Sequence, residues 1–147
     1  SDETTRERCV AMNALIIACA DGHIAGPLSV LQAELGEPDA DRLLLPGGPL
    51  QLIHSGAGCR VVLDWVRMQL EIHGNRTIHL VSHQDCGAYE RVLGGLGFDQ
   101  QELLERDLRR AKSLLETAHP GVEVHSHIIP WDDHGGVPGF GLAEAVE

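Results

Sequence analysis

The chain reads Leu15-Ile16-Ile17-Ala18-Cys19-Ala20-Asp21-Gly22-His23, an apolar run followed at once by a polar cluster. A second stretch has the same arrangement, in which Ile78-His79-Leu80-Val81 leads into His83-Gln84-Asp85-Cys86. Short and mostly apolar runs are typical of parallel strands that are covered on both faces. The two stretches therefore predict two buried strands, each followed by side chains that can bind a metal ion.

Strand-like and helix-like segments alternate along the rest of the chain. The expected strands are 13–19, 42–45, 77–82 and 122–129, and the expected helices are 27–35, 57–73 and 99–118. Inward-facing positions at helical spacing are Val62, Trp65, Val66, Gln69 and Leu70 in the second helix and Leu104, Leu108, Ala111 and Leu115 in the third. This order predicts an α/β fold with three α/β/α layers and a mostly parallel sheet of about four strands.

The strand order matters because it brings the two polar clusters together. We expect the order 2-1-3-4, in which the carboxyl ends of the first and third strands flank the topological switch point where open parallel sheets bind ligands. The fourth strand alternates in character and is expected to be a less buried, edge-like strand. Both polar clusters then lie at one edge of the sheet.

The length of 147 residues fits a single domain, residues 1–147. Within it we expect residues 1–12 to form an N-terminal arm and the glycine-rich residues 131–147 to form a C-terminal tail. Cys9 and Cys59 lie among apolar residues, and we interpret them as buried or half-buried structural cysteines rather than disulfide partners.

The net charge of −11 argues against nucleic acids and anionic membranes as partners. No apolar run approaches the length of a membrane span, and Ser1-Asp2-Glu3 lacks the basic start of a signal peptide. We therefore expect a cytoplasmic protein that binds neither nucleic acid nor membrane.

The two clusters offer the ligands of a zinc site. Cys19, His83 and Cys86 supply two sulfur atoms and one ring nitrogen, which leaves a fourth position for water or for Asp21. Zinc lowers the pKa of bound water to about 7, and a nearby carboxylate can orient the resulting hydroxide. A redox pair of Cys19 with Cys86 is a minor alternative, because the chain has no Cys-x-x-Cys motif.

The same motifs resemble those of the β-class carbonic anhydrases, in particular a short bacterial branch that reads Cys-x-Asp-x-Arg, Pro-Gly-Gly and His-x-Asp-Cys-Gly-Ala-Tyr. The matching residues are Cys19-Ala20-Asp21-Gly22-His23, Pro46-Gly47-Gly48 and His83-Gln84-Asp85-Cys86-Gly87-Ala88-Tyr89. The resemblance covers about residues 13 to 130. It implies Zn²⁺ on Cys19, His83 and Cys86, a homodimer or higher oligomer, and reversible hydration of carbon dioxide to bicarbonate by zinc-bound hydroxide.

One residue departs from the family pattern, because His23 stands where the family has arginine. In the family that arginine pairs with the aspartate and holds it off the metal. Arginine is always charged and binds a carboxylate with two parallel donors, whereas histidine titrates near neutral pH. Asp21 is then freer to become the fourth zinc ligand, which gives a closed or pH-gated site. Alternatively His23 is a polar loop residue and another basic side chain replaces the arginine.

Other residues near the motifs are candidates for lining or supporting the site. Gly47 and Gly48 permit a close backbone approach or a sharp turn. Asp85, Gly87 and Tyr89 line the pocket or bond to the ligands, although capping of a turn is an alternative for Asp85. The remaining histidines are interpreted as surface or structural residues: His54, His73, His79, His119, His125, His127 and His134. His125 and His127 share one face of a strand and can bind adventitious metal.

Three functions agree with these features. The first is carbon dioxide hydration by a zinc lyase. The second keeps the metal chemistry and changes the substrate to carbon disulfide or carbonyl sulfide, which are also linear molecules. The third is a non-catalytic zinc protein in which Asp21 permanently closes the site and the domain binds a partner.

Overall fold

The computed structural model describes residues 13–93, 100–134 and 137–147, so the expected arm 1–12, with Cys9, lies outside the described residues. The helical elements are η1 (Gly22–Ile24), α2 (Ala25–Glu34), η2 (Gly48–Leu52), α3 (Gly58–His73), α4 (Gly87–Leu93) and α5 (Gln100–Ala118). The strands are β1 (Leu15–Cys19), β2 (Asp41–Leu45), β3 (Thr77–His83), β4 (Glu123–Ile129), β5 (Trp131–His134), β6 (Val137–Phe140) and β7 (Glu144–Val146).

The main sheet has five strands in the order β2-β1-β3-β4-β7. The first four are parallel, and β7 is antiparallel to β4. The predicted order 2-1-3-4 is therefore confirmed, while the fifth strand was not predicted. Strand β1 is completely buried along its length, as its apolar sequence requires for a strand with neighbours on both sides and layers on both faces.

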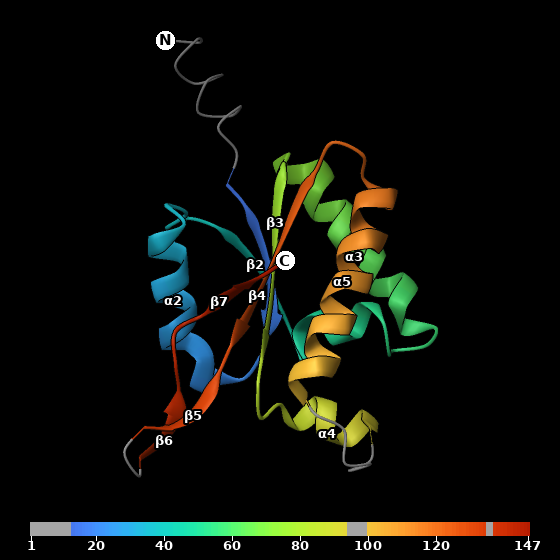
Figure 1. Cartoon of the computed structure of the whole chain (residues 1–147). Helices are drawn as coiled ribbons and strands as arrows, with labels where there is room; N and C mark the ends of the chain where they lie inside the picture. Colours follow the sequence, from blue (N-terminus) through green and yellow to red (C-terminus); the bar gives the residue numbers. More distant parts are fainter. Residues whose placement is uncertain (1–12, 94–99, 135–136) are drawn as a thin grey trace.

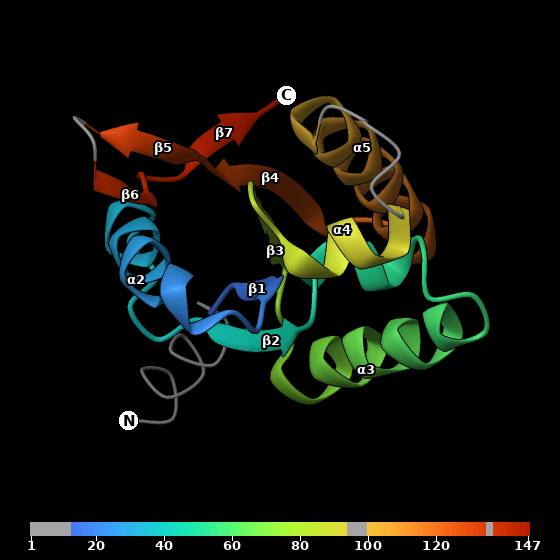
Figure 2. The ribbon, with the colours of Figure 1, turned by 90° about the horizontal axis from the view of Figure 1, so that it is seen from below.

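The molecule has the three predicted layers (Figures 1 and 2). Helix α2 and the β5–β6 hairpin cover one face of the sheet, and α3 and α5 cover the other. The predicted inward residues of α5 are all buried: Leu104, Leu108, Ala111 and Leu115. No helix in the described part of the chain is long and apolar enough to cross a membrane.

Helix α3 differs from the prediction in the exposure of one residue, Trp65. It ends as expected at Gly74, which adopts the left-handed conformation with φ of 67° and donates its N–H to the carbonyl of Leu70. Val62 and Val66 face the core, but 45% of Trp65 is exposed, so its predicted inward position is wrong. Apolar residues occupy more than one face of this helix, and periodicity alone does not show which face the core covers.

The C-terminal part is folded, contrary to the prediction of a tail over residues 131–147. Its first half forms the β5–β6 hairpin, and its end pairs with β4 through Ser126↔Val146, His127↔Ala145 and Ile128↔Glu144. Strand β4 is consequently an internal strand, and the prediction of an edge strand is wrong. A three-residue strand in a glycine-rich segment carries too little periodicity to be recognised.

Candidate metal centre

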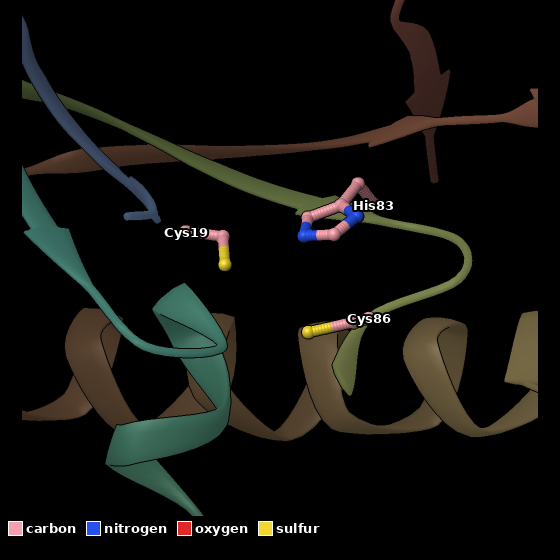
Figure 3. A group of neighbouring side chains, drawn as sticks. All are labelled: Cys19, His83 and Cys86. Carbon is pink, nitrogen blue, oxygen red and sulfur yellow. The ribbon is translucent and has the colours of Figure 1, made fainter. Parts of the chain in front are cut away.

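Cys19, His83 and Cys86 converge at the carboxyl end of the parallel strands. Cys19 is the last residue of β1, His83 is the last residue of β3, and Cys86 follows in the turn before α4. Figure 3 shows the two sulfur atoms and the imidazole directed toward a common point. All three residues are buried, and their ligand atoms lie within 4.8 Å of one another. The structure thus brings together the three predicted ligands.

The hydrogen bonding of His83 leaves one ring nitrogen available. Its Nδ1 lies 2.7 Å from the carbonyl oxygen of Gln84. Because a carbonyl oxygen only accepts, Nδ1 carries the proton in the neutral ring, and Nε2 presents a lone pair. Nε2 is buried and has no hydrogen-bond partner among the described residues. Histidines that bind metals commonly have their other ring N–H held by an oxygen in this way, which fixes the orientation of the ring.

The sulfur atoms of Cys19 and Cys86 lie close together, and each affects the ionisation of the other. Hydrogen bonding from the Cys86 thiol lowers the pKa of Cys19, and the same interaction, together with burial, raises the pKa of Cys86. The N–H of Gly47 also donates to Cys19 Sγ at 3.3 Å. A divalent cation bound between these sulfur atoms would stabilise both thiolates.

Gly48 allows the loop after β2 to approach β1. A Cβ on Gly48 would lie 2.7 Å from the backbone carbon of Ala18 and the backbone nitrogen of Cys19, and the residue has φ of +54°. Gly47 also has a positive φ, of +78°. The Pro-Gly-Gly motif therefore places backbone directly against a ligand residue.

The turn that carries Cys86 is anchored by glutamines. The side chain of Gln84 bonds to Gln101 at 2.6 Å and accepts from the N–H of Trp131 at 2.9 Å, and Gln100 accepts from the Cys86 N–H at 3.4 Å. Asp85 is exposed and has φ of 54°, and its carboxylate makes no hydrogen bond within the described residues. Its observed place is at the bend of the turn.

The hairpin that was predicted as part of a tail forms one wall of the centre. Phe140 of β6 lies edge-on to the His83 ring, with ring centroids 5.2 Å apart, and Trp131 of β5 packs on Phe140 at 4.8 Å. Gly87, the first residue of α4, is exposed and does not take part in this packing.

His23 itself holds Asp21. Asp21 Oδ1 accepts from the His23 backbone N–H at 2.9 Å and lies 2.8 Å from His23 Nδ1. The backbone hydrogen bond, helped by the imidazole, lowers the pKa of Asp21, so the carboxylate is ionised at neutral pH. Asp21 is absent from the converging group of Cys19, His83 and Cys86. The contacts with His23 account for this position of Asp21, and closure of the site by Asp21 stays a prediction.

Tyr89 belongs to a buried polar network beside the site, and the sequence analysis missed this network. Its hydroxyl donates to Asp107 Oδ2 at 3.0 Å, and His54 Nε2 lies 2.6 Å from the same oxygen. Burial and the Asp107 carboxylate raise the pKa of Tyr89, so the phenol stays protonated. The signal available in the sequence was an acidic residue in phase with the inward stripe of α5, between Leu104 and Leu108.

The residues fit a zinc ion by their chemistry. They provide two neighbouring buried thiols, one of which has a lowered pKa, and an imidazole nitrogen that burial leaves without a hydrogen-bond partner. Two sulfurs and one nitrogen form the protein ligand set of a zinc site with one exchangeable position.

Among the comparisons with known proteins, the match to a solved structure bears on the fold. No protein-family model matches the chain. Two uncharacterized proteins, from Rickettsia bellii and Rickettsia conorii, are each 24% identical over 143 residues; the match spans 88% of this chain and 85% and 75% of theirs. A crystal structure of tetrameric β-carbonic anhydrases from Sordaria macrospora matches with a TM-score of 0.50 and 13% identity, over 98% of this chain and 89% of that one. The fold is that of the β-carbonic anhydrases.

Within the β-carbonic anhydrase fold, the buried Cys-His-Cys group occupies the switch point that the strand order predicted. The sequence analysis named all three residues of this group. It missed Gln84 as an anchor and Phe140 as a wall, because both act through contacts between segments that are distant in the chain.

Proposed function

We propose that the protein is a zinc-dependent lyase that reversibly hydrates carbon dioxide to bicarbonate. Cys19, His83 and Cys86 would hold the ion, which supplies a coordinated water with a pKa of about 7. The single observation that carries the proposal is that Asp21, the residue able to close the fourth position, is bonded by its Oδ1 to His23. This arrangement supports an open site rather than a closed, non-catalytic one.

The other residues have roles that follow from their contacts. Asp21, ionised beside the ligands, accepts a hydrogen bond from the water that attacks carbon dioxide and orients it. His23 positions Asp21, as the family arginine would, through two bonds to one oxygen. The Gly47 N–H and the Gln84 carbonyl fix Cys19 and His83 respectively, which preserves the geometry of the centre.

The test is stopped-flow hydration of carbon dioxide by the zinc-loaded chain, with Cys86→Ser as the variant that lacks a ligand. We expect hydration by the native chain and none by Cys86→Ser. His23→Ala removes the ring contact to Asp21 Oδ1 while the backbone N–H bond remains, and it should reduce kcat about tenfold, whereas His23→Arg should retain activity.

Three results would contradict the proposal or part of it. An inactive native chain with an active His23→Arg variant would show that Asp21 closes the site in solution. Hydrolysis of carbon disulfide without hydration of carbon dioxide, measured on the same zinc-loaded protein, would reject the substrate. Inactivity of all variants in both assays would reject the lyase.

The proposal includes a homo-oligomer. Helix α3 carries a row of half-exposed or more exposed apolar side chains at spacings of four, three and four residues: Val61 at 48%, Trp65 at 45%, Met68 at 54% and Ile72 at 68%. Such a row is typical of a helix face that packs against another helix. The structurally similar Sordaria macrospora proteins are tetrameric. A second copy of this chain is the partner that we propose for α3.

We also propose a cytoplasmic location. Cys19, Cys59 and Cys86 are free cysteines, and Cys59 is half-buried beside Ser55, as expected for a structural thiol. Free thiols are maintained in reducing compartments. Fractionation of the source cells with antibody detection tests this location.

A further inference from the structure

A second cluster of metal-binding side chains lies on the sheet away from Cys19, His83 and Cys86. His79 of β3 is the register partner of His125 in the parallel strand β4, and His127 lies two residues further along β4. The ring centroids of His79 are 5.3 Å from His125 and 5.1 Å from His127. Side chains two apart on a strand share one face, so the three imidazoles gather on the same face of two adjacent strands.

Two of these histidines are buried and lie in contact with each other. His79 is 5% exposed and His127 is 6% exposed. Their rings bond to each other, with His79 Nδ1 and His127 Nε2 separated by 3.0 Å. Among the described residues, neither ring bonds to a carboxylate or to a backbone carbonyl. A cation that bound both of these nitrogens would replace the hydrogen bond between the two rings.

The environment keeps these rings in the form that binds metals. Burial lowers the pKa of His79, and burial together with the neighbouring histidines lowers the pKa of His127 to about 4. Both rings are consequently neutral at pH 7, and a neutral imidazole is the ligand form. A cavity of about 470 Å³ adjoins the three histidines and is also lined by Ser126, Lys112 and Glu147.

We propose that His79, His125 and His127 form a second metal site, which binds a divalent late first-row transition cation such as Zn²⁺, Ni²⁺ or Co²⁺. Three histidine nitrogens are an established ligand set for such ions. Two nitrogens of one tetrahedral zinc lie about 3.3 Å apart, since each Zn–N bond is about 2.0–2.1 Å. The observed separation of 3.0 Å between His79 and His127 needs only a small opening.

The third ligand requires a rotation of the His125 ring. In the structure this ring stacks on His79 with an interplanar angle of 24°, so the three nitrogens do not yet converge. The side chain of His125 is 51% exposed, and its Nε2 lies 3.4 Å from the exposed Glu123 carboxylate. Rotation therefore breaks little packing, and Glu123 is placed to orient the ring from its other nitrogen.

The test separates this site from the first by its ligand atoms. The full chain carrying Cys19→Ser and Cys86→Ser is titrated with Co²⁺, followed by calorimetry and by absorbance. We expect one bound Co²⁺ per chain with ligand-field absorbance and without the thiolate charge-transfer absorbance of a sulfur site. The result is independent of carbon dioxide hydration, which requires the two cysteines.

Single variants in that background identify the ligands. His125→Ala and His127→Gln should each weaken Co²⁺ binding at least tenfold, while His119→Gln, a histidine outside the cluster, should leave it unchanged. His125 is half-exposed, so His125→Ala is expected to fold even if His127→Gln does not. The proposal is overturned if no Co²⁺ binds up to millimolar concentration. It is overturned equally if binding is the same in His125→Ala as in the parent.

Discussion

The closest backbone approach at the metal centre makes Gly48 the sharpest position for a stability test. Gly48→Ala places a Cβ 2.7 Å from the backbone of Ala18 and Cys19, whereas ordinary contacts begin at 3.4 Å. Both contacting atoms are backbone, so no side-chain rotation can relieve the clash. One segment must move by about 0.7 Å, which is overpacking of a buried site.

The expected loss of stability has two parts. A residue other than glycine in the left-handed region costs about 1–2 kcal/mol. Overpacking adds about 1–3 kcal/mol, so Gly48→Ala should reduce the free energy of unfolding by about 2–5 kcal/mol. Gly36→Ala is the matched control, because Gly36 has φ of +69° and a Cβ there meets nothing within 4 Å. This control should lose only the cost of the left-handed conformation, about 1–2 kcal/mol.

Urea unfolding of both metal-free variants measures the difference, and zinc affinity provides a second measurement. Displacement of the Cys19 backbone should weaken zinc binding by about tenfold or more in Gly48→Ala. Gly36→Ala should bind zinc normally. Equal destabilisation of the two variants would refute the argument that close approach, rather than backbone conformation, requires glycine at position 48.

Three further perturbations test other parts of the structure. Tyr89→Phe removes a donor from the buried Asp107 carboxylate and should cost about 1–3 kcal/mol in urea unfolding; a loss below about 0.5 kcal/mol would contradict the network. The pKa of His127 is lowered to about 4 by burial, so the unfolded chain binds a proton below about pH 6.5 that the folded chain does not. Stability of the metal-free chain should therefore fall by up to about 3 kcal/mol from about pH 6.5 to about pH 4, and His127→Gln should flatten this fall. An unchanged slope in the variant would show that other groups cause it. Sedimentation should show at least a dimer for the native chain and a monomer for Trp65→Glu combined with Met68→Glu, while a native monomer would refute the α3 interface.

The fold could be predicted for those segments whose own composition indicates their structure. The apolar composition of β1 and β3 specifies strands that are buried on both faces, and the alternation with helices then restricts the topology to parallel crossovers. Strands β5 to β7 lacked such a signal, because their stability comes from pairing with each other and with β4. The exposure of Trp65 was missed for a related reason, since α3 has apolar residues on more faces than the core covers.

The ligands of the site could be predicted from the sequence, whereas the contacts that support them could not. Cys19, His83 and Cys86 stand at strand ends, where topology alone brings them together. The bond between His23 and Asp21 depends on the turn at η1, in which both the backbone N–H and the ring reach one oxygen. Asp107 is a charged residue inside a helix packing face, and its burial depends on donors from two other segments.

The parallel pairing of β1 with β3 also has a consequence for biogenesis. Because the donors stand at the ends of two strands from distant parts of the chain, a nascent polypeptide that has not reached Cys86 possesses no complete chelating set. Long-range strand pairing forms slowly compared with local turns, so under the proposed zinc binding the ion would enter after the central sheet has assembled. Maturation would then take place in two steps, in which the metal-free chain first folds its core and then binds the ion.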